Sequence, residues 1–174
     1  MIGLKQRFSR PRNRRALAVG TTVLAAALLG TQWMALAQDQ SAAMPKDAIF
    51  ARRTLMDFIS DAMDEIEAMT SSGKINLATG TKRADQMSVM LQIFPHVFPP
   101  STNQWKPNVE MDPETGTAAS PDIWLKFADF YQRANTASKT AFKISRAEKE
   151  ADFKALTEEL RSACDSCHAL YLKQ

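Results

Sequence analysis

Three residues close to the C-terminus have the types and the spacing of a chemical site. Cys164 and Cys167 are the only cysteines among 174 residues, and His168, one of two histidines, follows directly. On a helix, two thiols three residues apart can reach the two vinyl groups at one edge of a porphyrin, and the next imidazole points at the iron from the same face. Cys-x-x-Cys-His is the attachment signature of a c-type haem. The sequence therefore predicts one covalently attached haem c.

Other uses of the two cysteines stay open. An exported Cys-x-x-Cys pair can form a structural disulfide or a dithiol redox centre, so an exported dithiol oxidoreductase is an alternative. Such centres usually lie at a helix N-terminus after a strand, and no strand pattern precedes Cys164. A zinc site would need two more ligands than this stretch offers, and His96 is the other histidine. We interpret His96 as a solvent-facing loop residue, with iron ligation as the alternative.

The first 37 residues have the composition of a secretory signal peptide. Six basic residues precede an uncharged, mostly apolar run from Ala16 to Leu29, and residues 35–37 form an A-x-A cleavage site. The run is short for the roughly 20 residues that span a bilayer, which disfavours an uncleaved membrane anchor. We expect residues 1–37 to be removed on export by the general route, leaving a periplasmic protein without a membrane anchor.

Export changes the charge of the chain. The whole sequence carries 22 Lys and Arg against 19 Asp and Glu, a net charge of +3. The six basic residues of the signal leave with it, so residues 38–174 carry 16 basic and 19 acidic side chains, a net charge of −3. The basic balance belongs to the export signal and gives no reason to expect nucleic-acid binding. The remaining 137 residues suit a single domain with one core.

Four stretches of residues 38–174 have the apolar spacing of amphipathic helices. The first begins at Pro45 and ends near Gly73; the second, residues 81–94, lies between Gly80 and Pro95. The third begins at Ser120 and ends within 143–150, where residues 145–148 resemble a capping box, and the fourth ends near Leu172. The expected inward stripe of the first helix is Ile49, Arg52, Met56, Ile59, Met63 and Ile66, and that of the fourth is Phe153, Leu156, Leu160, Ala163, Cys167 and Leu170.

The connections between these helices indicate the fold. Two are short, whereas residues 95–120 have no sustained period and contain five of the eight prolines. A loop this long usually has a function, and we expect it to cross one end of the structure and to cover it with Phe98 and Trp105. The pattern predicts an all-α protein, an antiparallel four-helix bundle with one long loop between helices two and three.

One charged residue interrupts the apolar stripe of the first helix. Arg52 needs a partner if it is buried, and a haem propionate would supply one. The alternative is an arginine whose stem covers the core while its head group reaches water. The nearby methionines, Met56 among them, are mostly core residues, because a thioether adapts to irregular gaps; at most one of them is a ligand.

A haem motif on the last of four helices resembles the cytochrome c′ family, the class II c-type cytochromes, over the whole of residues 38–174. Residues 45–52 resemble the opening of that family, and residues 121–124 resemble the start of its third helix. Residues 94–100 resemble a loop found especially in its low-spin members. Many members have a basic residue four positions after the histidine, where this chain has Leu172 followed by Lys173.

The resemblance implies a role for each site residue. Cys164 and Cys167 would attach the haem, His168 would be the proximal iron ligand, and Arg52 would contact a propionate. Met56 lies at the distal position, where low-spin members have an iron ligand. In high-spin members the iron is five-coordinate and binds nitric oxide or carbon monoxide.

Two functions follow from these roles. We favour an electron carrier with His168 and Met56 on the iron, which is no enzyme and which would exchange electrons with redox partner proteins of the periplasm. The alternative is a five-coordinate, gas-binding protein. The resemblance also implies that the chain can form a homodimer through its first two helices.

Overall fold

The computed structural model describes residues 20–112 and 115–173. The chain divides into two units, Met1–Ala42 and Ala43–Gln174, and the site residues all belong to the second. Residues 1–19 of the expected signal peptide lie outside the described residues, and residues 20–42 are helical. Within the part of the chain that the structure describes, no helix is long and apolar enough to span a membrane.

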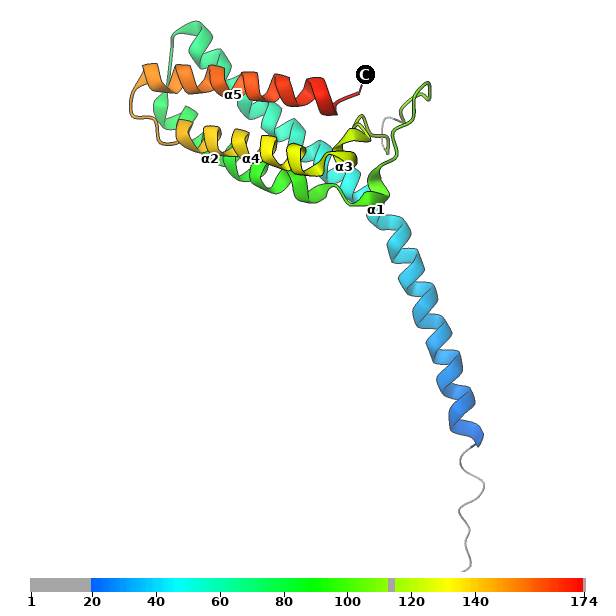
Figure 1. Ribbon diagram of the computed structural model, residues 1–174. Helices are drawn as coiled ribbons and strands as arrows, with labels where there is room; N and C mark the ends of the chain where they lie inside the picture. The colour runs from blue at the N-terminus through cyan, green and yellow to red at the C-terminus, as the bar shows by residue number, and fades with distance from the viewer. Residues whose placement is uncertain (1–19, 113–114, 174) are drawn as a thin grey trace, which may run out of the picture. The chain divides into compact units, whose positions relative to one another are not determined.

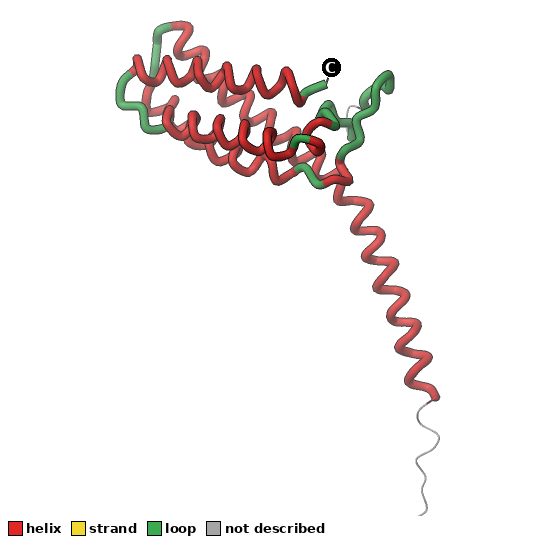
Figure 2. The backbone as a smooth tube through the Cα atoms, viewed as in Figure 1, coloured by secondary structure: helices red, strands yellow, loops and turns green. Residues whose placement is uncertain are grey.

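The unit from Ala43 to Gln174 is a bundle of four long helices (Figures 1 and 2). They are α1 (Gly20–Ser72), of which residues 43–72 belong to this unit, α2 (Leu77–Ile93), α4 (Phe127–Ile144) and α5 (Glu150–Tyr171). Successive long helices run in opposite directions (Figure 1). A short helix, α3 (Asp122–Leu125), precedes α4, and the long loop contains two turns of 3-10 helix, η1 (Phe94–Val97) and η2 (Pro100–Thr102). The predicted four-helix bundle with a long loop is confirmed.

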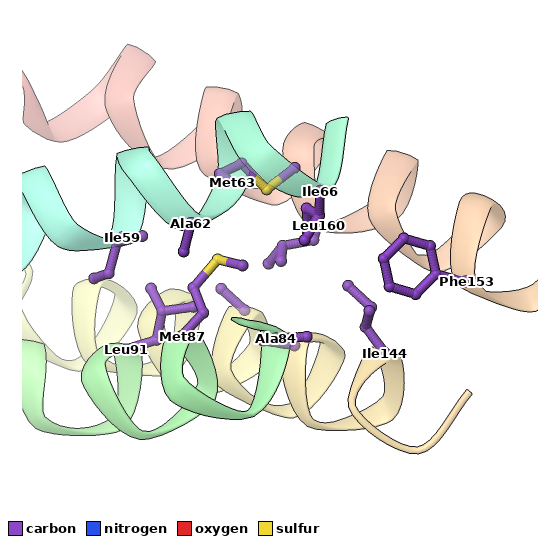
Figure 3. Close-up of a cluster of buried hydrophobic side chains, with 12 residues drawn as sticks. Ile59, Ala62, Met63, Ile66, Ala84, Met87, Leu91, Ile144, Phe153 and Leu160 are labelled. Atoms are coloured by element: carbon purple, nitrogen blue, oxygen red, sulfur yellow. The ribbon is translucent and has the colours of Figure 1, made fainter. Parts of the chain in front are cut away.

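The core lies where the four long helices meet, and Figure 3 shows its side chains pointing toward one another. It contains Ile59, Ala62, Met63 and Ile66 from α1, Ala84, Met87 and Leu91 from α2, Ala137, Ala141 and Ile144 from α4, and Phe153 and Leu160 from α5. A second cluster of Phe98, Ile123, Phe130 and Tyr171 lies under the long loop. The stripes predicted for the first and fourth helices contain Ile59, Met63, Ile66, Phe153 and Leu160 of this core.

Two predicted helix starts are wrong. Helix α1 does not begin at Pro45 but continues through it, because the alanine-rich residues before the proline also favour a helix. Helix α2 begins before Gly80, at Leu77, and Asn76 caps it by accepting a hydrogen bond from the backbone N–H of Thr79 at 3.1 Å. Gly80 is buried inside α2, where the ring of Phe153 leaves no room for a Cβ. Its role is close packing and not helix termination.

The break predicted within residues 143–150 and the end predicted near Leu172 agree with α4 and α5. Three other predictions, on the third helix, the capping box and Leu170, need correction. The helix expected from Ser120 is divided into α3 and α4 at Lys126, whose φ of −123° and ψ of 40° leave the helical region. Residues 145–148 form no capping box, because Ser145 donates to the carbonyl of Phe142 and α5 begins after Lys149 without a side-chain cap. Leu170 is 44% exposed, because it lies at the end of α5 beyond the core.

Candidate functional site

Helix α5 presents the two thiols and the imidazole to one cavity. Glu150 and Asp152 lie in its first turn, where carboxylates complement the positive end of the helix, and His168 lies in its last turn. Cys164 and Cys167 are half-buried, and His168 is exposed. All three side chains line the same cavity. The spacing of these residues in the sequence therefore places them on one face of α5.

The cavity is lined by residues of α1, α2, α4 and α5, together with α3 and the long loop. The space between its side chains measures about 1170 Å³, including solvent at its open side. Most of its walls are apolar, among them Ile59, Met63, Leu91, Phe130, Ala134 and Ala137. An apolar cavity with a few convergent polar groups is the usual form of a cofactor site.

Arg52 enters this cavity from α1 and is held by the long loop. Its Nη1 donates to the Thr102 Oγ1 at 2.8 Å, and its Nη2 donates to the Thr102 carbonyl at 3.2 Å and to the Thr117 Oγ1 at 2.5 Å. The guanidinium also lies over the rings of Phe98 and Trp124, at 4.8 and 5.8 Å. With only 4% of its surface exposed, Arg52 does not have the water-reaching head group of the alternative interpretation.

Among the described residues, the hydrogen-bond and aromatic partners of Arg52 are all neutral. Burial lowers its pKa from 12.5 to about 10, so it stays protonated at neutral pH. The ion pairs found among the described residues do not include Arg52. A buried cation without an anion is costly, and a carboxylate bound in the cavity would relieve that cost.

Met56 lies on α1 one turn after Arg52 and lines the same cavity. Its side chain is half-buried and packs against the edge of the core cluster. A methionine on α1 and a histidine on α5 therefore lie on the walls of one cavity. Local sequence spacing alone could not bring these two candidate ligands together, because the two residues are far apart in the chain.

Burial also sets the state of the two thiols. It raises the pKa of Cys164 and raises that of Cys167 to about 11, with the neighbouring Cys164 adding to the effect. A dithiol redox centre needs a lowered thiol pKa, because the thiolate is the nucleophile. The environment of Cys164 and Cys167 therefore disfavours dithiol chemistry.

The sequence analysis missed the contacts that fasten the end of α5. Tyr171 is buried and donates from its hydroxyl to the Asp129 carboxylate at 2.5 Å, and Arg133 pairs with the same carboxylate at 2.7 Å. The backbone N–H groups of Ser120 and Lys173 donate to the carbonyls of Tyr171 and Ala118. These bonds tie α5 to α4 and to the long loop just after His168; no local motif indicates them.

The long loop covers one end of the bundle, largely as predicted. Phe98 is buried, and its carbonyl accepts a hydrogen bond from the Trp124 indole at 3.1 Å. Trp105 is half-buried beneath the Lys173 ammonium, 5.9 Å from its ring centre. His96 is exposed and lies edge-on to the Tyr131 ring, in agreement with its interpretation as a solvent-facing residue.

Comparison with known proteins gives the relatives of the chain. The sequence model of the family Cytochrome C′ matches residues 47–171. Cytochrome c-556 of Agrobacterium tumefaciens (strain II Chrys) is 30% identical over 123 residues, which cover 69% of this chain and 92% of that protein.

Solved structures agree in fold. Cytochrome c′ from Thermochromatium tepidum superposes with a TM-score of 0.64 at 19% identity, and cytochrome c prime from Shewanella frigidimarina with 0.64 at 22%. Each match covers 75% of this chain and 97% of the other. The family match spans most of the chain and includes both cysteines and His168. The chain therefore belongs to the cytochrome c′ family, whose members are non-enzymatic haem proteins with one covalent haem c.

Proposed function

We propose that this protein is an electron carrier whose haem iron has one histidine and one methionine ligand. Cys164 and Cys167 form the two thioether bonds, His168 is the proximal ligand and Met56 is the distal ligand. The observation that carries this proposal is that Met56 on α1 and His168 on α5 line one cavity with both cysteines. Arg52 contacts a haem propionate.

The residues of the cavity fit a haem. Apolar walls match the porphyrin faces, and the half-buried thiols of Cys164 and Cys167 lie on one wall at the spacing of the attachment motif. The buried Arg52 guanidinium offers a positive charge that the described residues leave uncompensated. A propionate is a carboxylate and forms strong, charge-assisted hydrogen bonds with a guanidinium.

Iron with two protein ligands supplies one-electron chemistry and offers no position for a substrate. Met/His ligation raises the reduction potential of a c-type haem. The protein contributes by keeping both ligands on helices whose faces are fixed by the bundle. The loop of residues 94–100, which resembles that of the low-spin members, also supports six-coordinate iron.

The alternative is a five-coordinate iron that binds nitric oxide or carbon monoxide, with Met56 packed beside it. A thioether is a weak ligand, so core packing can retain Met56 away from the metal. A solved structure of a cytochrome c prime variant from Alcaligenes xylosoxidans is a nitric oxide complex, with 19% identity to this chain. This relative makes gas binding the second candidate function.

The ferric absorption spectrum distinguishes the two functions. We expect low-spin iron with a methionine-to-iron charge-transfer band, and little change of the ferrous spectrum on addition of carbon monoxide. Met56→Ala should produce high-spin iron with little loss of fold. A high-spin wild-type spectrum with ready carbon monoxide binding would favour the gas-binding alternative. A pyridine haemochrome assay that detects no covalent haem would instead favour dithiol chemistry.

We also propose that residues 1–37 direct export and are removed, so that the mature chain begins at Gln38 in the periplasm. Proteins of this family are typically periplasmic, and the compact unit begins at Ala43, just after the predicted cleavage site. Periplasmic redox proteins would then be its electron donors and acceptors. N-terminal sequencing of the exported protein should read from Gln38.

Proteins of this family often form dimers, and we propose a homodimer through α1 and α2. A surface groove between these helices exposes Phe58 and Val89, by 58% and 51%, beside Met90. Its lining carries both charges, with Asp61, Glu65 and Asp85 beside Arg83, and Arg83 pairs with Glu65 of the same chain. In a two-fold interface the same surface of both copies forms the contact. A groove that carries both charges can therefore pair with the same groove of a second copy of this chain.

A further inference from the structure

Arg161 on α5 forms a two-pronged ion pair with Glu67 on α1. Its Nε donates to one Glu67 carboxylate oxygen at 2.6 Å, and its Nη2 donates to the other. The same Nη2 lies 3.6 Å from an Asp64 carboxylate oxygen. The side chains of Arg161 and Glu67 are 36% and 34% exposed, so water surrounds this pair less than an ordinary surface pair. A fork of this kind fixes orientation as well as distance.

This ion pair lies beside the haem site. Arg161 lines the cavity and precedes Cys164 by three residues on α5. Glu67 lies on α1, about three turns beyond Met56. The pair therefore connects the helix of the attachment motif to the helix of Met56.

The ion pairs of the described residues that do not involve Arg161 connect elements other than α1 and α5. Arg83 pairs with Glu65 between α2 and α1, and Arg133 pairs with Asp129 within α4. In residues 20–112 and 115–173, α1 and α5 are joined by ion pairs at Arg161 alone. The contacts of Arg161 with Glu67 and Asp64 are therefore the ion pairs that connect α1 to α5 in the part of the chain that the structure describes.

We propose that Arg161 and Glu67 are positioning residues that hold α1 against α5 and so set how firmly Met56 stays on the iron. The inference rests on the proposed Met56 ligation. A thioether is a weak ligand, and its bond is sensitive to a small displacement of the helix that carries it. Loss of the pair frees α1 to move away from α5, which lowers the fraction of molecules with Met56 bound and lets an external ligand compete better.

The test uses the holoprotein and carbon monoxide as the probe. Arg161→Met, Glu67→Ala and the double variant are titrated with carbon monoxide in the ferrous state, and covalent haem content and unfolding midpoint are measured in parallel. Glu65→Ala is the matched control, since it removes a carboxylate two residues away on α1 that pairs with α2 instead. Glu67→Gln replaces Glu67→Ala if the latter does not fold.

We expect each single variant to raise the apparent carbon monoxide affinity about threefold and to weaken the methionine-to-iron band. The double variant should resemble Arg161→Met, because that change alone already removes the contacts of Arg161 with Glu67 and Asp64. Three outcomes would overturn the proposal while Met56 ligation stands. They are an unchanged carbon monoxide affinity in the single variants, additive effects in the double variant, and an equal effect of Glu65→Ala. High-spin iron in the wild-type protein would overturn Met56 ligation itself, and the positioning role with it.

Discussion

At the scale of single residues, Arg52 is the buried arginine among those that line the cavity. Its guanidinium is held by two threonines and two aromatic rings, all neutral. Hydroxyl and carbonyl acceptors fix the position of a cation without cancelling its charge. Thr102 and Thr117 therefore leave Arg52 available to an anion in the cavity, which a carboxylate partner in their place would not.

The charge of Arg52 should raise the reduction potential of the haem. The Arg52 cation stabilises the more electron-rich ferrous state. Arg52→Met keeps an apolar stem and removes that cation. We expect the potential to fall by roughly 60 mV, which for one electron corresponds to about 1.4 kcal/mol. Potentiometric titration measures this, with the exposed Arg83→Met as a control that should stay near the wild-type value. Equal potentials for Arg52→Met and wild type would contradict contact with a propionate.

The Tyr171–Asp129 bond makes a second prediction at this scale. Burial and then the bond to Asp129 raise the pKa of Tyr171 from 10 to about 12. Because the folded pKa of this acid is raised, its contribution to stability is present below pH 10 and is lost as the pH rises toward 12. In a Tyr131→Phe background, the tyrosinate absorbance should therefore titrate near pH 12. Adding Asp129→Asn should lower the midpoint toward 10; a native midpoint already at 10 would exclude the bond.

At the scale of elements, packing decides where helices begin and break. Apolar periodicity predicted the four long helices because it reports which face is buried. It could not predict that Gly80 allows α2 to pack closely against the Phe153 ring, since a glycine in a sequence can equally well indicate the end of a helix. Nor could it predict the break at Lys126. The acceptors of Arg52 were also missed, because their hydrogen bonds join residues 50 and 65 positions apart.

Gly80→Ala tests the close contact between α2 and α5. In an open helix this change would stabilise by up to about 1 kcal/mol. Here the new Cβ would lie 2.5 and 2.7 Å from two carbons of the Phe153 ring, which is fully buried. Overpacking costs about 1–3 kcal/mol, so we expect a net loss of stability in chemical denaturation. The double variant with Phe153→Leu should recover part of it. Greater stability of Gly80→Ala alone would show that the ring can shift.

At the scale of the whole molecule, charge is distributed unevenly. Residues 38–174 have a net charge of −3, yet the charged lining of the cavity, among the residues described, consists of Arg52, Arg53, Arg133 and Arg161. The acidic excess therefore lies outside the cavity. The sequence revealed the net charge after export, whereas the basic lining appears only when α1, α4 and α5 are brought together. This distribution suits a cofactor with two carboxylates.

The proposed dimer makes the last prediction. A second copy on the α1–α2 groove would bury Phe58 and Val89, and large exposed apolar side chains at an interface centre contribute most of its affinity. Phe58→Glu places a charge against that centre in both copies and should weaken association at least tenfold, which is about 1.4 kcal/mol. Sedimentation equilibrium of the haem-containing protein measures the change. Phe142→Glu is the control, since Phe142 on α4 is 49% exposed and lies outside the groove. A dimer that Phe142→Glu disrupts and Phe58→Glu preserves would place the interface on α4 and leave the α1–α2 groove facing solvent.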